Sequence, residues 1–513
     1  MFIFKKNGLL HRFMLLAITL LVFAEAKLSA TDVIPLRSCR MGTPNPQFSP
    51  RRAKAMTNGE NPYIGQRRQL VVLASFQDQD FTGEPEATLQ TWNNILNAED
   101  FTEGQFAGSV RDYFLAQSYG LFDLTFDLVM VTLPDVRYKY RSTDDDENSQ
   151  YMVDDIIDVL QNEPINWSIY DWDGDGFVNQ LLIIYAGKGM NAGGGSNTIW
   201  PHQWWLSQHM NLETEDPNDF RSYRTVFSGN KEYIIDCYCC VQEYVNHGDV
   251  QSSFGTLCHE YSHCFGFPDF YNGSTKYVGS WDLMDYGNYN GDGYCPAGYS
   301  AHERWIMGWL TLTELTTETT LSNIPALSDE GQAYLVRNDG YANEYYIVEN
   351  RQQQGWDEEM PGRGILIFHI DYDPYIWASP YGTPNSTYHQ SYTIMPANNK
   401  KSTYQAAGWT YPYGDNDQLT NTSSPAATLI HENTDGTKLM NKPLTQLAVT
   451  GGLASFEFTN NVTGLSLTPS PGLKGEGRYY TLDGRIIPNH TTLSRGTYIV
   501  RYANGEIKKV VKQ

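Results

Sequence analysis

Basic residues are scarce in this chain of 513 residues. Lys and Arg number 36 against 59 Asp and Glu, and the formal net charge is −23. A protein that binds nucleic acid needs a basic face to neutralise phosphates, so this composition argues against a nucleic-acid partner. The acidity fits a soluble protein in an open, salty medium.

The chain also lacks any apolar run that reaches the roughly 18 residues needed to span a bilayer. Its longest run, residues 13–23, is shorter and follows three basic residues, Lys5, Lys6 and Arg12. Small residues at 24–26 and 28–30 offer cleavage sites, and the whole pattern is typical of a secretory signal peptide over residues 1–30. The alternative is an uncleaved anchor. We therefore expect a secreted or cell-surface protein without a stable membrane span.

Cysteines are few, and six of the seven lie between residues 237 and 295. An exported protein meets an oxidising compartment, where cysteines can pair. We expect the run Cys237-Tyr-Cys239-Cys240 to form a disulfide-bearing strand. The alternative is a metal knuckle, which is less favoured because no second cysteine pair has the spacing of a zinc knuckle.

Apolar and aromatic residues are plentiful, at 41% and 13%, so the chain can bury large cores. At roughly 100–200 residues per domain its length suggests about three domains. Residues 31–66 are rich in Pro, Arg and polar residues without periodicity, which indicates a propeptide or linker. No internal repeat of solenoid length is present.

Hydrophobic patterning predicts both helices and strands in the first half of the chain. Apolar runs at 70–74 and 181–185, and alternation over 124–130, predict strands. Ser109 and Asp112 predict the start of a helix. Residues 319–460 differ in composition from the first half: Thr, Asn and Tyr become common, and Asp-Gly turns occur. Residues 461–513 contain short strand-like runs and hairpin turns. Both segments are expected to be β-structured.

The strongest motif is His259-Glu260-Tyr-Ser-His263, which matches H-E-x-x-H. On a helix, positions i and i+4 share a face, so both imidazoles can bind one metal ion while Glu260 can reach the open side of the ion without ligating it. Gly266 follows three residues after His263 and can end the helix in a left-handed turn. The chain can then double back so that Asp269 supplies a third ligand.

These residues resemble a known family. The run from His259 through Gly266, Pro268 and Asp269, followed by Ser-Trp-Asp-Leu-Met at 280–284, is similar to the immune inhibitor A-type metallopeptidases of the metzincin clan. Further blocks at 109–120, 185–187, 199–202 and 344–362 resemble the same family in the same order. The resemblance extends over roughly residues 67–460.

The resemblance implies an α+β metzincin-like catalytic domain at 67–318, with a mixed twisted sheet plus active-site and backing helices, followed by all-β domains. It implies a secreted zinc endopeptidase that hydrolyses extracellular proteins or peptides through a zinc-activated water and a glutamate general base. His259, His263 and Asp269 would be zinc ligands and Glu260 the general base. Met284 would pack beneath the metal, and Tyr286 would bind the oxyanion.

Some of these assignments have alternatives. Asp269 could be a capping or turn aspartate, with Asp282 and Asp285 as other candidates for the third ligand. Tyr286 could be a packed tyrosine. The whole protein could instead be a secreted carbohydrate-active or carbohydrate-binding protein, because aromatics stack on sugars as well as filling β cores. A catalytically inert, metal-bearing adhesin is a further alternative, which the intact motif disfavours.

A second metal site is predicted between residues 171 and 179. Oxygen donors alternate along it and a glycine stands at the sixth position, as in calcium loops. The expected calcium ligands are Asp171, Asp173, Asp175, Phe177 and Asn179. Position 12 of the loop is Leu182 and not Glu, so this is not an EF-hand. The alternative is an Asx-rich turn.

Two weaker resemblances lie near the ends of the chain. Cys39, with Arg37, Arg40, Gly42 and Pro44 around it, faintly resembles a cysteine switch that keeps a zymogen latent; the alternative is an unpaired cysteine. Residues 461–513 resemble the sorting domains of type IX secretion, which implies a secretion machinery as a partner. The alternative is a plain β-domain.

Overall fold

The computed structural model describes residues 61–142, 148–209, 221–244, 253–377 and 383–460, and beyond them the backbone of four short strands. The predicted signal peptide at 1–30, Cys39 and residues 31–60 of the predicted propeptide lie outside the described residues. Within the described part of the chain, no helix is long and apolar enough to cross a membrane.

The first half of the chain is built on a five-stranded mixed sheet with the order β2-β1-β3-β7-β4. Its members are β1 (Gly65–Ser75), β2 (Phe122–Thr132), β3 (Leu181–Lys188), β7 (Cys237–Tyr244) and β4 (His202–Trp205). All neighbours are parallel except β4, which runs antiparallel to β7 along the sheet edge. The strands predicted at 70–74, 124–130 and 181–185 are therefore confirmed.

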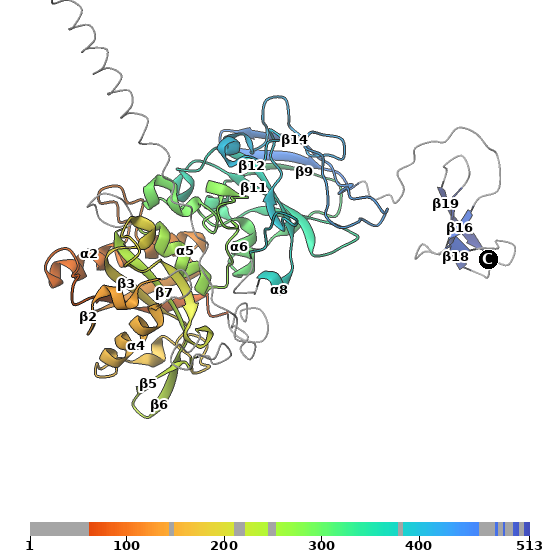
Figure 1. Cartoon of the computed structure of the whole chain (residues 1–513). Coiled ribbons are helices and arrows are strands. Elements are labelled where there is room, and N and C mark those ends of the chain that lie inside the picture. The colour runs from red at the N-terminus through yellow and green to blue at the C-terminus, as the bar shows by residue number, and fades with distance from the viewer. Residues whose placement is uncertain are drawn as a thin grey trace, which may run out of the picture.

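Helices pack around this sheet (Figure 1). Those of the first half are α2 (Pro85–Asn97), α3 (Val110–Gln117), α4 (Ser149–Leu160), α5 (Gly255–Cys264) and α6 (Ala301–Ile306). The predicted helix start is confirmed, because Ser109 and Asp112 form a reciprocal capping box at the beginning of α3. The helix α5 lies against β7 and β4, which places its residues at the antiparallel edge of the sheet.

Short elements fill the connections. A hairpin of β5 (Arg224–Ser228) and β6 (Lys231–Ile235) projects at one end of the molecule (Figure 1). Short segments of 3-10 helix occur at η2 (Arg137–Tyr140), η3 (Trp167–Ile169), η4 (Met190–Ala192), η5 (Leu206–Gln208), η6 (Gly279–Trp281), η7 (Gly287–Gly293), η8 (Gly355–Asp357) and η9 (Thr403–Gly408).

Strands dominate the chain from residue 313 to 460. One sheet has the order β13-β12-β11-β10-β8 and a second the order β14-β15-β9. Their bounds are β8 (Thr313–Glu314), β9 (Thr319–Ile324), β10 (Ala333–Arg337), β11 (Glu344–Arg351), β12 (Gly364–Asp371), β13 (Tyr392–Ile394), β14 (Leu444–Thr450) and β15 (Leu453–Phe458). Helices in this part are the four-residue α7 (Leu327–Glu330) and α8 (Pro374–Trp377).

The predicted C-terminal segment contains a four-stranded antiparallel sheet of order β17-β16-β18-β19. These strands are β16 (Arg478–Tyr480), β17 (Ile486–Ile487), β18 (Gly496–Arg501) and β19 (Ile507–Lys512). The rest of residues 461–513 lies outside the described residues.

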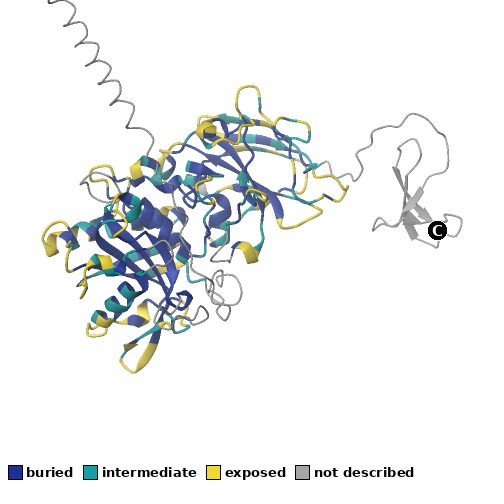
Figure 2. Ribbon diagram, viewed as in Figure 1, coloured by how far each residue is buried: buried dark blue, intermediate teal, exposed yellow. Residues whose placement is uncertain are grey.

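The central sheet of the second half faces two different cores. Along β12, Leu366 and Phe368 belong to the large core that also contains the first sheet, whereas Ile365 and Ile367 belong to a smaller core shared with β14 and β15. Successive side chains of a strand point to opposite faces of the sheet, so one strand can contribute side chains to both cores. Dark blue, buried segments occur in both sheets in Figure 2. The large core contains residues of both halves of the chain, which are therefore packed together.

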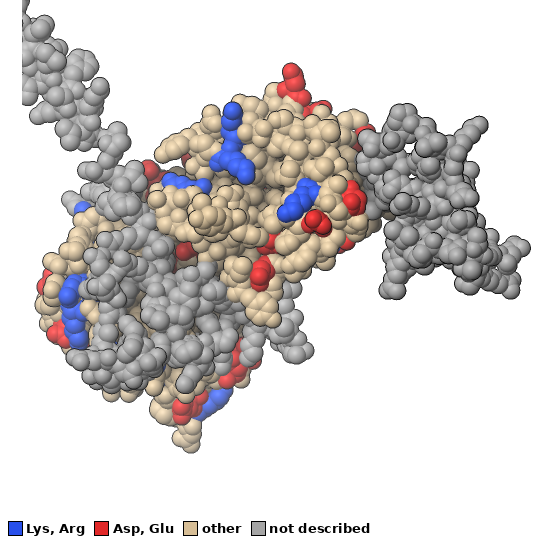
Figure 3. All heavy atoms as spheres, turned by 45° about the vertical axis from the view of Figure 1, so that its right-hand side comes forward, with Lys and Arg blue, Asp and Glu red and all other residues tan. Residues whose placement is uncertain are grey.

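A buried ion network also joins the two halves. The guanidinium of Arg351, which is fully buried, pairs with Asp357 at 2.8 Å and with Glu349 at 2.9 Å, and it donates to the carbonyl of Gly298. Glu349 in turn accepts the N–H of Ala301 at the start of α6. On the face in Figure 3, basic and acidic side chains are scattered among uncharged ones.

The disulfide expected for the cysteine run is not present in the described residues. Cys237, Cys239 and Cys240 do lie on a strand, β7, but none of the six described cysteines is joined in a disulfide. Alternate residues of a strand point to opposite faces, so Cys240 faces His202 while the thiol of Cys237 contacts that of Cys264. The strand was predicted correctly, but the disulfide was not. These thiols pack as small buried groups instead of pairing.

Replacing Arg351 with Met should destabilise the protein strongly, because it leaves the buried carboxylates of Glu349 and Asp357 without their partner. We expect the free energy of unfolding in urea to fall by about 3–5 kcal/mol. Arg68→Met is the matched control, since Arg68 pairs with Asp127 at the surface and should cost no more than about 1 kcal/mol. Equal effects of the two variants would contradict the role given to the buried network.

Candidate active site

The helix α5 carries both histidines of the motif and ends immediately after them. His259 and His263 are buried on one face, and their ring centroids lie 4.8 Å apart. The helix stops at Cys264, and Gly266 adopts a φ of +100°. A residue with a side chain rarely takes this conformation, so the glycine lets the chain turn back sharply.

Backbone carbonyls fix the orientation of both imidazoles. Nδ1 of His259 lies 2.9 Å from the carbonyl oxygen of Leu283, and Nδ1 of His263 lies 2.7 Å from that of Phe267. A carbonyl oxygen only accepts, so each Nδ1 carries the proton and each Nε2 is left as a lone-pair donor. This is the arrangement of metal-binding histidines, whose second nitrogen is held by a fixed acceptor.

After the turn at Gly266, the chain brings Asp269 close to both histidines. Its Oδ1 lies 3.1 Å from Nε2 of His259 and 3.3 Å from Nε2 of His263. Among the described residues, Nε2 of His263 and Oδ1 of Asp269 are buried without a hydrogen-bond partner. Two imidazole nitrogens and one carboxylate oxygen converge here, and they fit the donor set of a divalent metal such as zinc.

The electrostatics of the cluster favour a cation. Burial disfavours protonation of His259, but its contact with Asp269 and the charge of Glu260 outweigh burial and raise its pKa to about 9. Burial by itself raises the pKa of Asp269, but the two histidines outweigh it and hold the pKa below its usual value. Positive charge, whether a proton or a metal ion, is therefore stabilised between these side chains.

The other two carboxylates considered as third ligands have structural partners. Oδ1 of Asp282 accepts the N–H of Met284, and Oδ2 of Asp285 accepts the N–H groups of residues 277, 278 and 279 at 2.7–2.8 Å. Both carboxylates thus hold the turn that presents the carbonyl of Leu283 to His259. Met284 is fully buried in this turn, and its carbonyl accepts the N–H of Phe270.

A pocket of about 30 Å³ adjoins the cluster of His259, His263 and Asp269. Glu260 and His259 line it together with Tyr286, which the sequence analysis named, and Tyr271, which it did not. The ring of Tyr271 stacks on that of His259 with an interplanar angle of 19°. The remaining lining residues are Asn191, Trp200, Pro201, Thr256, Asp285, Asn288 and Tyr289.

The strand-rich half of the chain reaches into this site. Asn385, which is fully buried, donates from Nδ2 to the carbonyl of Phe270 at 2.8 Å and to that of Tyr392 at 2.8 Å. The ring of Tyr392 stacks on Phe270 with centroids 3.9 Å apart, and its hydroxyl donates to Oδ2 of Asp282 at 2.8 Å. These contacts hold Phe270, the residue next to Asp269, from outside the first half.

No sequence signal pointed to Asn385 or Tyr392. They lie 115 and 110 residues from their partners Phe270 and Asp282 and belong to no recognisable motif. Their contribution arises only when β13 packs against the turn after α5.

The predicted calcium loop brings three carboxylates together. Asp171, Asp173 and Asp175 place oxygen atoms within 4.8 Å of one another. Asp171 also accepts the N–H groups of Asp175 and Gly176, four and five residues on, at 3.0 Å. Asn179 accepts the N–H of Trp172, and the N–H of Phe177 is bound by Asp175. The loop thus has the geometry of a tight turn with acidic oxygens gathered on it.

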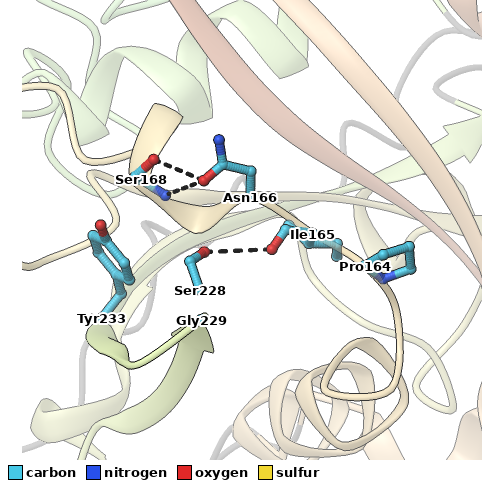
Figure 4. Close-up of a pocket in the computed structure, with 7 residues that line it drawn as sticks. All are labelled: Pro164, Ile165, Asn166, Ser168, Ser228, Gly229 and Tyr233. Carbon is cyan, nitrogen blue, oxygen red and sulfur yellow. Dashed lines mark hydrogen bonds between the residues drawn. The ribbon is translucent and has the colours of Figure 1, made fainter.

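A larger pocket, of about 390 Å³, lies elsewhere (Figure 4). It is lined by residues 164–168 before and within η3 and by Ser228, Gly229 and Tyr233 of the β5–β6 hairpin. None of the residues predicted for catalysis lines it. Its side chains are engaged locally, as in the bonds from Ser168 to Asn166 and from Ser228 to the carbonyl of Ile165 (Figure 4).

Tyr392→Phe should weaken metal binding, because it removes the hydroxyl that fixes Asp282 in the turn under His259. Loss of such an outer contact typically costs 10- to 100-fold in metal affinity, and we expect about tenfold here. Competition between the full chain and a chelator for zinc measures the change. Tyr388→Phe is the matched control, since Tyr388 is 99% exposed and should have no effect. Unchanged affinity in Tyr392→Phe would remove Tyr392 from this role.

Comparison with known proteins agrees with this geometry over part of the chain. Residues 91–309 match the family model described as immune inhibitor A peptidase M6, catalytic domain. This match includes the H-E-x-x-H helix and the turn to Met284, and it is narrower than the resemblance stated for residues 67–460. It leaves out β1 and the whole strand-rich half.

Relatives with known names are also similar to only part of this chain. The pre-pro-metalloprotease PrtV of Vibrio cholerae serotype O1 (strain M66-2) is 28% identical over 231 residues, which is 38% of this chain and 24% of the relative. Immune inhibitor A of Bacillus thuringiensis subsp. alesti is 29% identical over 192 residues, 32% of this chain and 25% of the relative. The matches thus cover about a quarter of the length of these relatives.

Among solved structures, OgpA from Akkermansia muciniphila aligns over 89% of this chain and 94% of its own, with 11% identity and a TM-score of 0.30. That score is too low to argue from. The family model and the curated relatives together show that this chain contains a region similar to the M6 peptidase catalytic domain, a metallopeptidase type that implies a catalytic metal.

Proposed function

We propose that this protein is a secreted zinc endopeptidase that cleaves peptide bonds in extracellular proteins. The observation that carries the proposal is the convergence of His259, His263 and Asp269, with Nε2 of His263 and Oδ1 of Asp269 buried and otherwise unpartnered. Glu260 lies beside this cluster and lines the adjoining pocket. The match to an M6 peptidase catalytic domain supports the same chemistry.

The three ligands would be Nε2 of His259, Nε2 of His263 and a carboxylate oxygen of Asp269. A bound zinc ion would supply Lewis acidity, which lowers the pKa of water and polarises a peptide carbonyl. Asp269 neutralises part of the positive charge, and the carbonyls of Leu283 and Phe267 keep both imidazoles in the tautomer that can bind. The chain's own residues thus prepare the site before any substrate arrives.

Glu260 is proposed as the general base and later the general acid. Burial raises the pKa of its carboxyl above the usual value, which brings it nearer to that of a group able to take and return a proton at neutral pH. It would accept a proton from the attacking water and return it to the leaving amine. Tyr286 lines the same pocket and is proposed to hydrogen-bond the oxyanion of the tetrahedral intermediate.

The ends of the chain are proposed to serve export and control. Residues 1–30 would be a cleaved signal peptide, residues 31–66 a propeptide in which Cys39 contributes to latency, and residues 461–513 a sorting domain read by a secretion machinery. The acidic composition and the described sheet at 478–512 are compatible with these roles.

The loop at 171–179 is proposed to bind calcium. Asp171, Asp173 and Asp175 supply the charge, and the carbonyl of Phe177 and the amide of Asn179 are the further oxygen donors. The loop leads into the central strand β3, so an ion here would fix the start of that strand.

Glu260→Gln should keep the metal but lose most activity, because glutamine preserves shape but cannot take a proton. We expect turnover of casein or gelatin to fall by about 10²–10⁴-fold with one zinc per chain retained. Asp269→Ala is the complementary variant and should lose zinc, as measured by metal analysis of the purified protein. Near-normal proteolysis in Glu260→Gln would reject the general-base role. Undiminished zinc in Asp269→Ala would exclude Asp269 as a ligand.

Calcium removal should lower thermal stability without removing zinc. A calcium-selective chelator is expected to reduce the melting temperature of the wild type by several degrees, and added calcium should restore it, because the ion stabilises only the folded loop. Asp173→Asn, in which the loop keeps its shape but loses a charge, should show a smaller response to calcium. An identical melting temperature with and without calcium would identify the loop as an Asx-rich turn.

A further inference from the structure

The pocket beside Glu260 contains buried oxygen atoms that satisfy nothing within the protein. Among the described residues, Oγ1 of Thr256, Oδ1 of Asp285, Oδ1 of Asn288 and Oδ1 of Asn191 have no hydrogen-bond partner. All four residues line this one pocket. Buried polar atoms are nearly always paired in proteins, so a group of four around one cavity indicates an external hydrogen-bond donor.

The four residues come from separate elements that the fold brings together. Thr256 lies in the first turn of α5, Asn191 in η4, Asn288 in η7, and Asp285 in the turn after Met284. Thr256, Asp285 and Asn288 are each at most 4% exposed. The pocket is therefore a built feature of the active-site region and not a surface irregularity.

Asp285 adds negative charge to the set. Its Oδ2 is occupied by three backbone N–H groups, and its Oδ1 is the unpartnered atom. Lys276 partly offsets this charge, but its ammonium lies over the ring of Tyr286, 3.0 Å from the centroid, and makes no ion pair with Asp285 within the described contacts. The four unpartnered atoms around the pocket are therefore all oxygens, and one of them belongs to a carboxylate.

Aromatic rings form the rest of the wall. Trp200, Tyr271, Tyr286 and Tyr289 line the same cavity. The faces of such rings attract cations, and a carboxylate combined with aromatic walls is a common way to hold an ammonium group. The cavity measures about 30 Å³, which is roughly the volume of two water-sized spheres. It therefore has room for a compact ammonium beside one water molecule, whereas a planar guanidinium is larger.

We propose that this pocket is a specificity subsite that binds the ammonium of a lysine side chain next to the scissile bond. Asp285 and Asn288 would accept its hydrogen bonds, with Thr256 at the side nearest α5. His259 and Glu260 line the same pocket, so a side chain held there belongs to a residue adjoining the bond being cut. This inference rests on the proposed peptidase function and adds a substrate class to it.

The test uses the full chain and sets of capped, internally quenched peptides. They differ only in having Lys, Gln, Met or Glu at either of the two positions flanking the scissile bond. We expect kcat/KM for Lys to exceed that for Met by at least tenfold at one of these positions, with Gln between them and Glu lowest. Equal cleavage of the Lys, Gln and Met peptides would overturn the proposal. A Gln peptide cut as well as the Lys peptide would also overturn it, since charge would then play no part.

A variant of Asp285 tests whether the lysine preference arises from this pocket. Asp285→Asn keeps an oxygen for the three backbone N–H groups but presents an amide in place of the negative oxygen, so the Lys-to-Met ratio should fall at least tenfold whatever the absolute rate. Asp292→Asn, the same change at an exposed position on η7, should leave the ratio unaltered. A lysine preference that survives Asp285→Asn would contradict the assignment.

A second variant covers the case in which Asp285→Asn does not fold. Thr256→Val removes the unpartnered hydroxyl and breaks no hydrogen bond of the protein, so it should fold and lower the Lys-to-Met ratio about threefold. An unchanged ratio here would count against the subsite. If the wild type cut none of the peptides, the peptidase proposal itself would fail; if it cut all of them equally, only the subsite would.

Discussion

One carboxylate oxygen shared between two imidazoles is the contact on which the rest of the site depends. Oδ1 of Asp269 approaches Nε2 of both His259 and His263, and among the described residues Oδ1 of Asp269 and Nε2 of His263 have no hydrogen-bond partner. The arrangement persists because each ring is held from behind by a backbone carbonyl. The helix fixes the spacing of the histidines, but only the turn after Gly266 makes their third partner available.

That turn is supported from two sides. Within the first half, Asp282 and Asp285 bind backbone N–H groups and shape the segment that carries the carbonyl of Leu283. From the second half, Asn385 and Tyr392 bind Phe270 and Asp282. The strand-rich half is thus a structural part of the candidate active site, which agrees with the shared core and with the buried partners of Arg351. The match to the peptidase catalytic domain ends at residue 309 and so covers the ligands without their outer support.

The sequence predicted local features much better than remote ones. The motif on α5 and the capping box of α3 are set by spacings of three or four residues, which a helix converts directly into contacts. The buried strands were evident as apolar runs. The helices α2 and α4 were missed, although α4 buries Met152, Ile156 and Leu160 at helical spacing. Asn385 could not be found, because its partners lie far away in sequence, and free thiols cannot be told from paired ones by composition.

The turn after Met284 has two tasks, which makes its residues hard to exchange. One oxygen of Asp285 holds the backbone that orients His259 through Leu283, and the other remains for the pocket. On the proposed function, a change at Asp285 would act on metal geometry and on substrate selection together, unless it keeps an acceptor for the backbone. The side chains of Asn288 and Thr256 hold no backbone group in the described contacts, so selectivity would be altered there with less effect on the proposed metal centre. We therefore expect specificity and catalysis to be coupled at Asp285 and separable at its neighbours.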